Sequence, residues 1–187
     1  MGGSATDDAE LIDRAKRGDV DAYGELVRRY QHDARRLAAA VAGAGVADDA
    51  AQEAFVRAYG FLHRFRPGAP FRPWLLMVVA NVARNQRRSV NRWTRAAQES
   101  GVRGQHAIAA PSAEDDALSR HRRGDLRAAV DALPNRYRDV VACRYLLDLS
   151  EEETARVLGL ARGTVKSRLS RALDRLERHL DPEVHRA

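Results

Sequence analysis

The chain has 187 residues, a formal net charge of +6 and 44% apolar residues. This apolar share supports a folded core and excludes wholesale disorder, and the length fits one domain or two small ones. The basic balance favours a polyanionic partner. A coding bias toward arginine accounts for most of the positive residues, since lysine occurs only at Lys16 and Lys166.

No segment approaches the roughly 20 apolar residues of a membrane span, and the acidic, polar N-terminus is unlike a secretory signal. We therefore expect a cytoplasmic protein that does not insert into membranes. The single cysteine, Cys143, cannot form an intrachain disulfide, and its apolar helical surroundings predict a buried residue. No second cysteine or suitably patterned histidine accompanies it, so we expect neither a metal site nor a cofactor.

Apolar residues repeat with the helical period in nearly every segment, and we predict an all-α protein. The first clear apolar face consists of Tyr23, Leu26, Val27 and Tyr30, on a helix that Asp19 or Asp21 can cap. Glycines at positions 43 and 45 end the segment that follows. A helix then starts near Asp48, with an apolar face of Ala51, Phe55, Tyr59 and Leu62.

Prolines and a glycine between residues 67 and 73 force a loop. The next helix begins around Pro73 and runs to about Trp93, with inward residues Leu75, Val78, Val79 and Val82. Helical spacing is lost from residue 94 to 113, and order returns near Ser112, which can cap a helix with acids in its first turn. We predict two small helical domains, residues 8–96 and 114–181, joined by a flexible linker over 97–113.

Pro134 divides the helical pattern of the second domain, and the last part of that domain has the pattern of a helix-turn-helix. Ser150 and Glu153 form a capping box, and Gly159 is placed to end the first helix in the left-handed conformation. The second helix has Val165, Leu169, Leu173 and Leu176 at core spacing. We expect its basic face to bind duplex DNA through Arg162, Thr164, Lys166, Ser167, Ser170 and Arg171. A helical hairpin with a solvated basic face is the alternative.

Residues 60–98 contain eight arginines, interleaved aromatic residues and no acidic residue. This composition is typical of proteins that bind single strands, because bases stack on aromatic rings and arginine neutralises phosphates. We expect the loop over residues 63–70 to form the rim of a pocket for a flipped base, with His63, Arg64, Phe65 and Arg66. On the following helix, the polar candidates for strand binding are Asn81, Arg84, Asn85, Arg87 and Arg88.

Each of these candidates has a structural alternative. Phe71 and Trp74 fit a core better than a base platform, whereas Phe65 is the better stacking candidate. The Arg87–Arg88 pair faces phosphate or is simply solvated. Upstream, a polar patch of Asp48, Asp49, Gln52 and Glu53 either satisfies the helix dipole or docks a basic helical partner. The dipole explains the two aspartates better than it explains Gln52 and Glu53.

These stretches resemble extracytoplasmic-function (ECF) sigma factors of bacterial RNA polymerase. The segments DAAQEAF (49–55), RFRPGAPFRPWL (64–75) and NVA (81–83) are similar to their region-two domain. The segments ALPNRYRDVV (132–141) and GTVKSRL (163–169) are similar to their region-four domain. The motifs occur in the family's order and cover most of the chain. One departure is Ala161, where a capping Ser or Pro is more usual, which leaves the start of the recognition helix open.

The resemblance implies a transcription initiation factor. In such a factor, Asp49, Gln52 and Glu53 dock on the clamp coiled coil of the core polymerase, which has β and β′ subunits. The loop over 63–70 captures a flipped base of the minus-ten element, and the helix with Asn81 and Arg88 holds the non-template strand. The recognition helix binds the minus-thirty-five element. The linker threads toward the active-site and RNA-exit channels, and an anti-sigma protein usually keeps such factors inactive.

Two other functions compete with this one. A stand-alone helix-turn-helix regulator would bind duplex DNA without polymerase, but it leaves the acid-free run of residues 60–98 unexplained. An enzyme is not expected, because the chain has no phosphate-binding loop and no zinc-protease motif, and its six histidines are scattered.

Overall fold

The computed structural model describes residues 3–99 and 117–180, with side chains described over 8–94 and 124–180. Within these ranges every regular element is a helix, and the chain divides into two compact units, residues 1–106 and 107–187. The predicted all-α fold of two small domains is confirmed. The domain boundaries near residues 96 and 114 stay predictions, and the expected cap at Ser112 lies outside the described residues.

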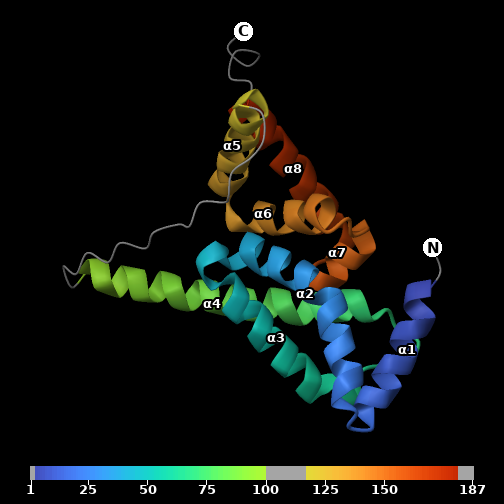
Figure 1. Cartoon of the computed structure of the whole chain (residues 1–187). Helices are drawn as coiled ribbons and strands as arrows, with labels where there is room; N and C mark the ends of the chain where they lie inside the picture. The colour runs from blue at the N-terminus through green and yellow to red at the C-terminus, as the bar shows by residue number, and fades with distance from the viewer. Residues whose placement is uncertain (1–2, 100–116, 181–187) are drawn as a thin grey trace. The chain divides into compact units, whose positions relative to one another are not determined.

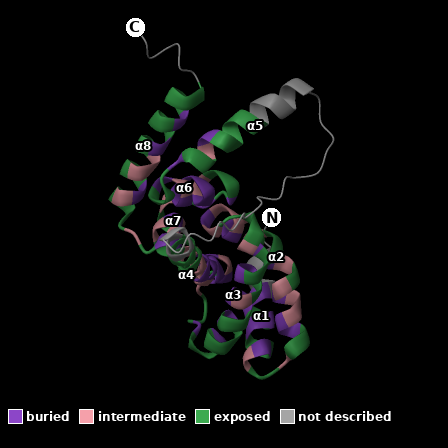
Figure 2. Ribbon diagram, turned by 90° about the vertical axis from the view of Figure 1, so that its left-hand side faces the viewer, coloured by how far each residue is buried: buried purple, intermediate pink, exposed green. Residues whose placement is uncertain are grey.

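The N-terminal unit contains four α-helices and two short 3-10 turns within the described residues (Figure 1). They are α1 (Gly3–Lys16), α2 (Val20–Ala42), η1 (Ala44–Val46), α3 (Ala47–Phe61), η2 (Leu62–Arg64) and α4 (Phe71–Glu99). Helices α2, α3 and α4 pack against one another, and α1 packs against α2. Their shared core includes the fully buried Leu26, Leu37, Leu75 and Val79. Figure 2 shows buried and exposed residues on opposite faces of these helices.

Local sequence signals set most of these helix ends. Asp19, one of the two predicted caps, accepts a hydrogen bond from the Ala22 backbone N–H at 3.0 Å. Gly43 ends α2 with a φ of 100°, a left-handed value that glycine adopts without strain. Helix α4 begins at Phe71, so Pro73 lies in the first turn, where its missing N–H costs no hydrogen bond. It continues past the expected end at Trp93 to Glu99 because no helix breaker intervenes.

The C-terminal unit has the elements of a helix-turn-helix domain. They are α5 (Ala117–Ala132), α6 (Asn135–Val141), a π-helical turn η3 (Ala142–Leu146), α7 (Glu151–Leu158) and α8 (Arg162–Leu180). Both hydrogen bonds of the predicted capping box at Ser150 and Glu153 are present. Gly159 adopts a left-handed φ of 64° at the end of α7. The backbone N–H groups of Thr164 and Val165 donate to the Ala161 carbonyl, which places the start of α8 at Arg162.

The core of this unit lies where α5 and α6 meet α8. Cys143 is buried, as predicted. The prediction that Leu173 belongs to this core is wrong, since its side chain is 40% exposed. Ala172 is fully buried instead. With about 100° per residue, Ala172 and Leu176 lie almost in line with Val165. Leu173 falls about 80° away, at the edge of the buried face.

Candidate nucleic-acid interface

A pocket of about 350 Å³ opens between α3, η2 and α4, in the arginine- and aromatic-rich part of the chain. Its lining residues are Arg57, Phe61, Arg64, Trp74, Met77, Val78, Asn81 and Val82. The structure thus brings two predicted site residues, Arg64 and Asn81, to one pocket. Phe61 is half exposed, and the Arg64 guanidinium carbon lies 5.9 Å from its ring centroid. Sequence reasoning did not single out Phe61 or Arg57.

Phe65 has a different environment from the one expected. It is only 4% exposed and packs edge-on against Phe71 and Trp74, with centroid distances of 5.7 and 5.0 Å. The expectation that Phe65 offers an open face to a base is therefore not met in this structure. An aromatic side chain removes more apolar area from water by turning inward. Trp74, which was assigned to the core, is partly exposed and lines the pocket.

The other predicted strand-binding residues differ in solvent exposure and in their contacts within the protein. His63, Arg66, Asn85 and Arg88 are exposed, whereas Arg84 and Arg87 are half-buried. Arg84 Nη1 donates to Asn81 Oδ1 at 3.2 Å. Arg87 Nη1 donates to the Val41 carbonyl in the last turn of α2 at 2.7 Å. The adjacent pair Arg87–Arg88 therefore combines one side chain that holds the fold with one that faces solvent.

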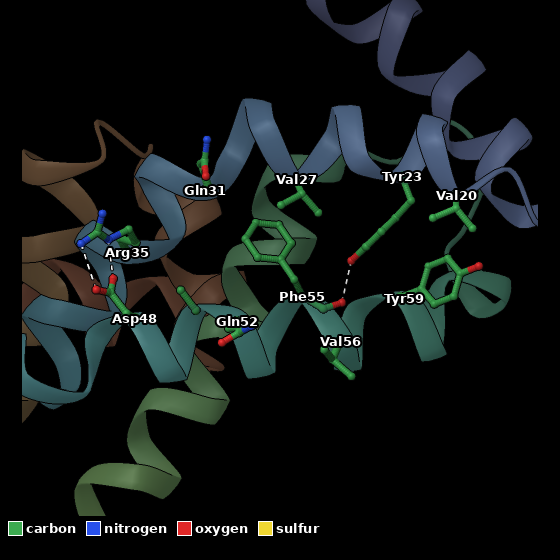
Figure 3. Close-up of a pocket in the computed structure, with 11 residues that line it drawn as sticks. Val20, Tyr23, Val27, Gln31, Arg35, Asp48, Gln52, Phe55, Val56 and Tyr59 are labelled. Carbon is green, nitrogen blue, oxygen red and sulfur yellow. Dashed lines mark hydrogen bonds and ion pairs between the residues drawn. The ribbon is translucent and has the colours of Figure 1, made fainter.

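The predicted docking patch on α3 lies beside an apolar groove. Asp49 and Gln52 are exposed, while Glu53 is held by Gln86 at 2.9 Å and by Arg57 at 2.5 Å. The groove has a volume of about 510 Å³ and runs between α2 and α3 (Figure 3). Two valines on its rim, Val20 and Val56, are 69% and 70% exposed. Sequence reasoning missed this groove because its two walls come from different helices.

Polar contacts fix the shape of the groove (Figure 3). At one end, Arg35 Nε pairs with Asp48 Oδ1 at 2.5 Å. In its wall, the Tyr23 hydroxyl donates to the Phe55 carbonyl at 2.6 Å. Burial raises the pKa of Tyr23 well above its usual value, so this donor stays protonated. These two contacts join α2 to α3, and the surface of the groove between them is mainly apolar.

The predicted duplex-binding residues lie along the start and middle of α8. Arg162, Lys166, Ser167, Ser170 and Arg171 are exposed, and Thr164 is half-buried. Arg162 Nε lies 3.4 Å from Glu151 Oε2 on α7, and the Ser167 hydroxyl donates to the Thr164 carbonyl at 3.2 Å. Apart from Arg162, these side chains have no ion pair within the described part of the chain. In that part of the chain, these exposed side chains are therefore free of ion pairs that would compete with DNA binding.

A second arginine cluster extends this face. The guanidinium carbons of Arg136 and Arg175 each lie 4.8 Å from the ring centroid of the buried Tyr137. A hydrogen bond from Arg136 lowers the pKa of Tyr137, burial opposes this, and the charges of Arg136, Arg175 and Arg171 add to the lowering. Arg175 follows Arg171 by one helical turn, so both lie on one face of α8. Arg136 and Arg175 were not among the predicted duplex-binding residues.

Comparison with known proteins assigns this arrangement to a family. Residues 26–94 match the model for Sigma-70 region 2, and residues 123–176 match the model for Sigma-70, region 4. The ECF RNA polymerase sigma-E factor of Escherichia coli strain K12 is 30% identical, over 96% of this chain and 97% of that relative. The chain belongs to the ECF sigma factor family. The RNA polymerase sigma-H factor of Pseudomonas aeruginosa is 32% identical to this sigma factor over the same shares of the two chains.

Solved structures are similar to the sigma factor along most of its length. CnrH, in complex with the cytosolic domain of CnrY, matches with a TM-score of 0.68 and 28% identity, over 95% of this chain and 99% of that chain. The sigma factor RpoE of Bartonella quintana, in complex with the anti-sigma factor NepR, matches with a TM-score of 0.69 over 86% of this chain and 98% of that chain. At 23% identity, the second match supports the fold alone.

As a member of this family, the sigma factor is a transcription initiation factor that directs RNA polymerase, and a stand-alone regulator is not favoured. Within the described ranges, no three His, Cys, Asp or Glu side chains come together as metal ligands would. None of the helices described has the length and apolar character needed to cross a membrane.

Proposed function

We propose that the sigma factor recruits bacterial core polymerase through α3, captures a base of the melted minus-ten element in the α3–η2–α4 pocket, and binds the minus-thirty-five duplex through α8. The observation that carries this proposal is the pocket, where Arg64 and Asn81 meet aromatic residues from two helices. A base taken out of a duplex needs an apolar wall to stack on and polar groups for its edge. Phe61 and Trp74 supply the first, and Asn81 supplies the second.

Strand opening then follows from differential binding. Unstacking costs a few kcal/mol per base, and stacking on an aromatic side chain returns about 1–3 kcal/mol. Two exposed cations, Arg66 and Arg88, neutralise the phosphates of the displaced non-template strand. Base stacking and phosphate neutralisation each contribute little free energy against the cost of unstacking. Together they favour the open strand when polymerase holds the factor on the promoter.

The C-terminal unit supplies duplex binding. Lys166 and Arg171 contact base edges of the minus-thirty-five element, and Ser167 and Ser170 let α8 lie deep in the major groove. Arg136 and Arg175 contact phosphates at the end of this face. An arginine that rests on an aromatic ring keeps its orientation, and it stays charged for a phosphate because the ring does not neutralise it.

The proposed partners are the core polymerase and a separate anti-sigma protein, both in the cytoplasm. The exposed valines and Gln52 on the α2–α3 groove suit a helical partner that buries apolar side chains and reaches the acidic Asp49 with basic ones. CnrH, which is 28% identical to this chain, was solved in complex with another protein, the cytosolic domain of CnrY. We infer that such a protein regulates this chain by covering the same surfaces.

Run-off transcription tests the proposal. Purified bacterial core polymerase is combined with a library of promoter-like templates, with and without the sigma factor. Transcripts that appear only with the factor would establish initiation and give the promoter consensus. Failure to bind core or to yield any transcript, together with tight duplex binding by the factor alone, would favour the stand-alone regulator.

A further inference from the structure

Lys16, one of the two lysines of the chain, connects α1 to the loop after η2. Its Nζ donates to the carbonyl oxygen of Phe65, 49 positions away, at 2.8 Å. The same ammonium lies 5.8 Å from the centroid of the Phe65 ring. A single side chain therefore holds both the backbone and the ring of a residue that follows Arg64 directly.

The Phe65 carbonyl needs such a donor. Phe65 is the residue at which the chain leaves η2 for an extended conformation, with φ −67° and ψ 126°, so its carbonyl leaves the helical hydrogen-bond pattern. The hydrogen bond to this carbonyl is partly buried, and a carbonyl withdrawn from water without a donor is costly. Among the described residues, Lys16 is the donor to this oxygen.

The position of Phe65 determines two walls of the base pocket. Its ring packs on Trp74 with a centroid distance of 5.0 Å, and Trp74 lines the pocket. Its neighbour Arg64 also lines the pocket and lies over Phe61. A shift of Phe65 would therefore move a stacking surface and a cation at the same time.

Side-chain contacts hold helix α1 against α2, and they thereby position the backbone of Lys16. Asp8 is buried and accepts hydrogen bonds from the Tyr30 hydroxyl and from Arg29 Nη1, the latter at 3.1 Å. These contacts fasten α1 to α2. The residues that match the region-2 model begin at position 26, so α1 lies outside the part of the chain that the match accounts for.

We propose that Lys16 is a positioning residue for base capture: it holds Phe65 inward and thereby sets Arg64 and Trp74 in the pocket wall. This inference rests on the proposed function of the pocket. Lys16 acts through Phe65, so its effect should be felt at the captured base and not at other parts of the promoter.

The test uses polymerase holoenzyme and forked promoter duplexes of the sequence selected by run-off transcription. Each minus-ten base of the non-template strand is replaced in turn by an abasic site, and dissociation constants are measured. The position at which wild type loses most affinity identifies the captured base. The variants are Lys16→Met, which removes the donor, Lys16→Arg, which keeps one, and Arg17→Met, a matched loss of charge at an exposed neighbour.

We expect Lys16→Met to weaken binding of the intact fork by about tenfold, within the range of one base–aromatic stack, and to bind the abasic fork as wild type does. Lys16→Arg should restore most of the loss, and Arg17→Met should show none. An equal loss on intact and abasic forks, or no loss on either, would overturn the inference. Comparing two templates with one protein preparation removes any effect of partial unfolding.

The same experiment separates this inference from the proposed function. Arg64→Ala and Asn81→Ala should also reduce the difference in affinity between intact and abasic forks. If these two variants reduce the difference and Lys16→Met does not, the result supports the base pocket but contradicts the positioning role of Lys16. If wild type shows no position-specific loss at all, the base pocket itself is wrong.

Discussion

Arg87 and Arg88 are adjacent in sequence but have different environments. Arg87 is half-buried and caps the last turn of α2 through the Val41 carbonyl, whereas Arg88 is exposed. Arg87→Ala should lower the free energy of unfolding by about 1–2 kcal/mol, because a partly buried carbonyl loses a charged donor. Thermal unfolding of the purified variant measures this loss.

Arg88→Ala is the matched substitution for DNA binding. It should leave the melting temperature unchanged and weaken open complexes at all promoters by a similar factor, because a phosphate contact carries no sequence information. Permanganate footprinting of the minus-ten region measures the open complexes. A fall in the melting temperature of Arg88→Ala, or an unchanged footprint, would contradict this division of roles.

The difference between these two arginines shows where sequence reasoning ends. The cap at Ser150 and the left-handed Gly159 depend on contacts within a few residues, and both could be predicted. Phe65 is contacted by Lys16 from another helix, and Arg87 donates to a carbonyl at the end of α2. Such long-range contacts leave no pattern in the local sequence. The segment of the chain that forms the pocket could therefore be predicted, but the residues that line the pocket could not.

At the level of the helix, the N-terminus of α2 has a charged cap whose effect depends on pH. Asp19 accepts hydrogen bonds from the Ala22 backbone N–H at 3.0 Å and from Arg14 Nε at 2.9 Å. These two contacts lower the pKa of Asp19 below its usual 3.8. The charged form is thus favoured in the folded state, and its stabilisation is present above the unfolded pKa and lost as the pH falls through the folded pKa.

Asp19→Ala should therefore lower the melting temperature at pH 7, and the gap to wild type should narrow as the pH falls below about 4. Asp19→Asn keeps a capping acceptor without the charge, so its melting temperature should lie between the other two at pH 7. Calorimetric scans across this pH range measure both effects. A gap that stays constant down to pH 2 would show that the carboxylate charge does not contribute.

Helix α8 carries the proposed base contact of Arg171 and the proposed phosphate contact of Arg175, one turn apart. Arg171→Ala should cost about 1–3 kcal/mol on the selected minus-thirty-five sequence and should relax specificity at one base pair. Arg175→Ala should weaken binding to all sequences alike and reduce the slope of log K against log salt by about 1. Fluorescence anisotropy with duplexes at several salt concentrations distinguishes the two. Uniform loss from Arg171→Ala across all upstream sequences would contradict its base-reading role.

At the scale of the whole molecule, the proposed surfaces for polymerase, open strand and duplex consist of different residues, although the first two share α3. The α2–α3 groove and the base pocket belong to the N-terminal unit, and α8 belongs to the C-terminal unit. A factor that holds a promoter at two places gains affinity through effective concentration, so neither contact has to be tight. This arrangement also means that polymerase binding and DNA binding can be lost separately.

Val56→Glu tests that separation. Val56 is 70% exposed on the rim of the groove, so a charge there should leave the fold intact but oppose an apolar partner. We expect affinity for core polymerase to fall at least tenfold, as for a moderate interface hot spot, while duplex binding by α8 is unchanged. Val90→Glu, at a 40% exposed valine of α4 that does not line the groove, is the matched control.

Both affinities can be measured on the same preparations, by anisotropy with labelled core and with labelled duplex. If Val56→Glu bound core as well as Val90→Glu does, the groove would not be the docking surface, and exposed residues outside it, such as Asp49, would have to carry the contact. If both variants lost core binding, charge repulsion at a distance would explain the result better than a local apolar contact. Only a loss confined to Val56→Glu identifies the groove as the place where polymerase is bound.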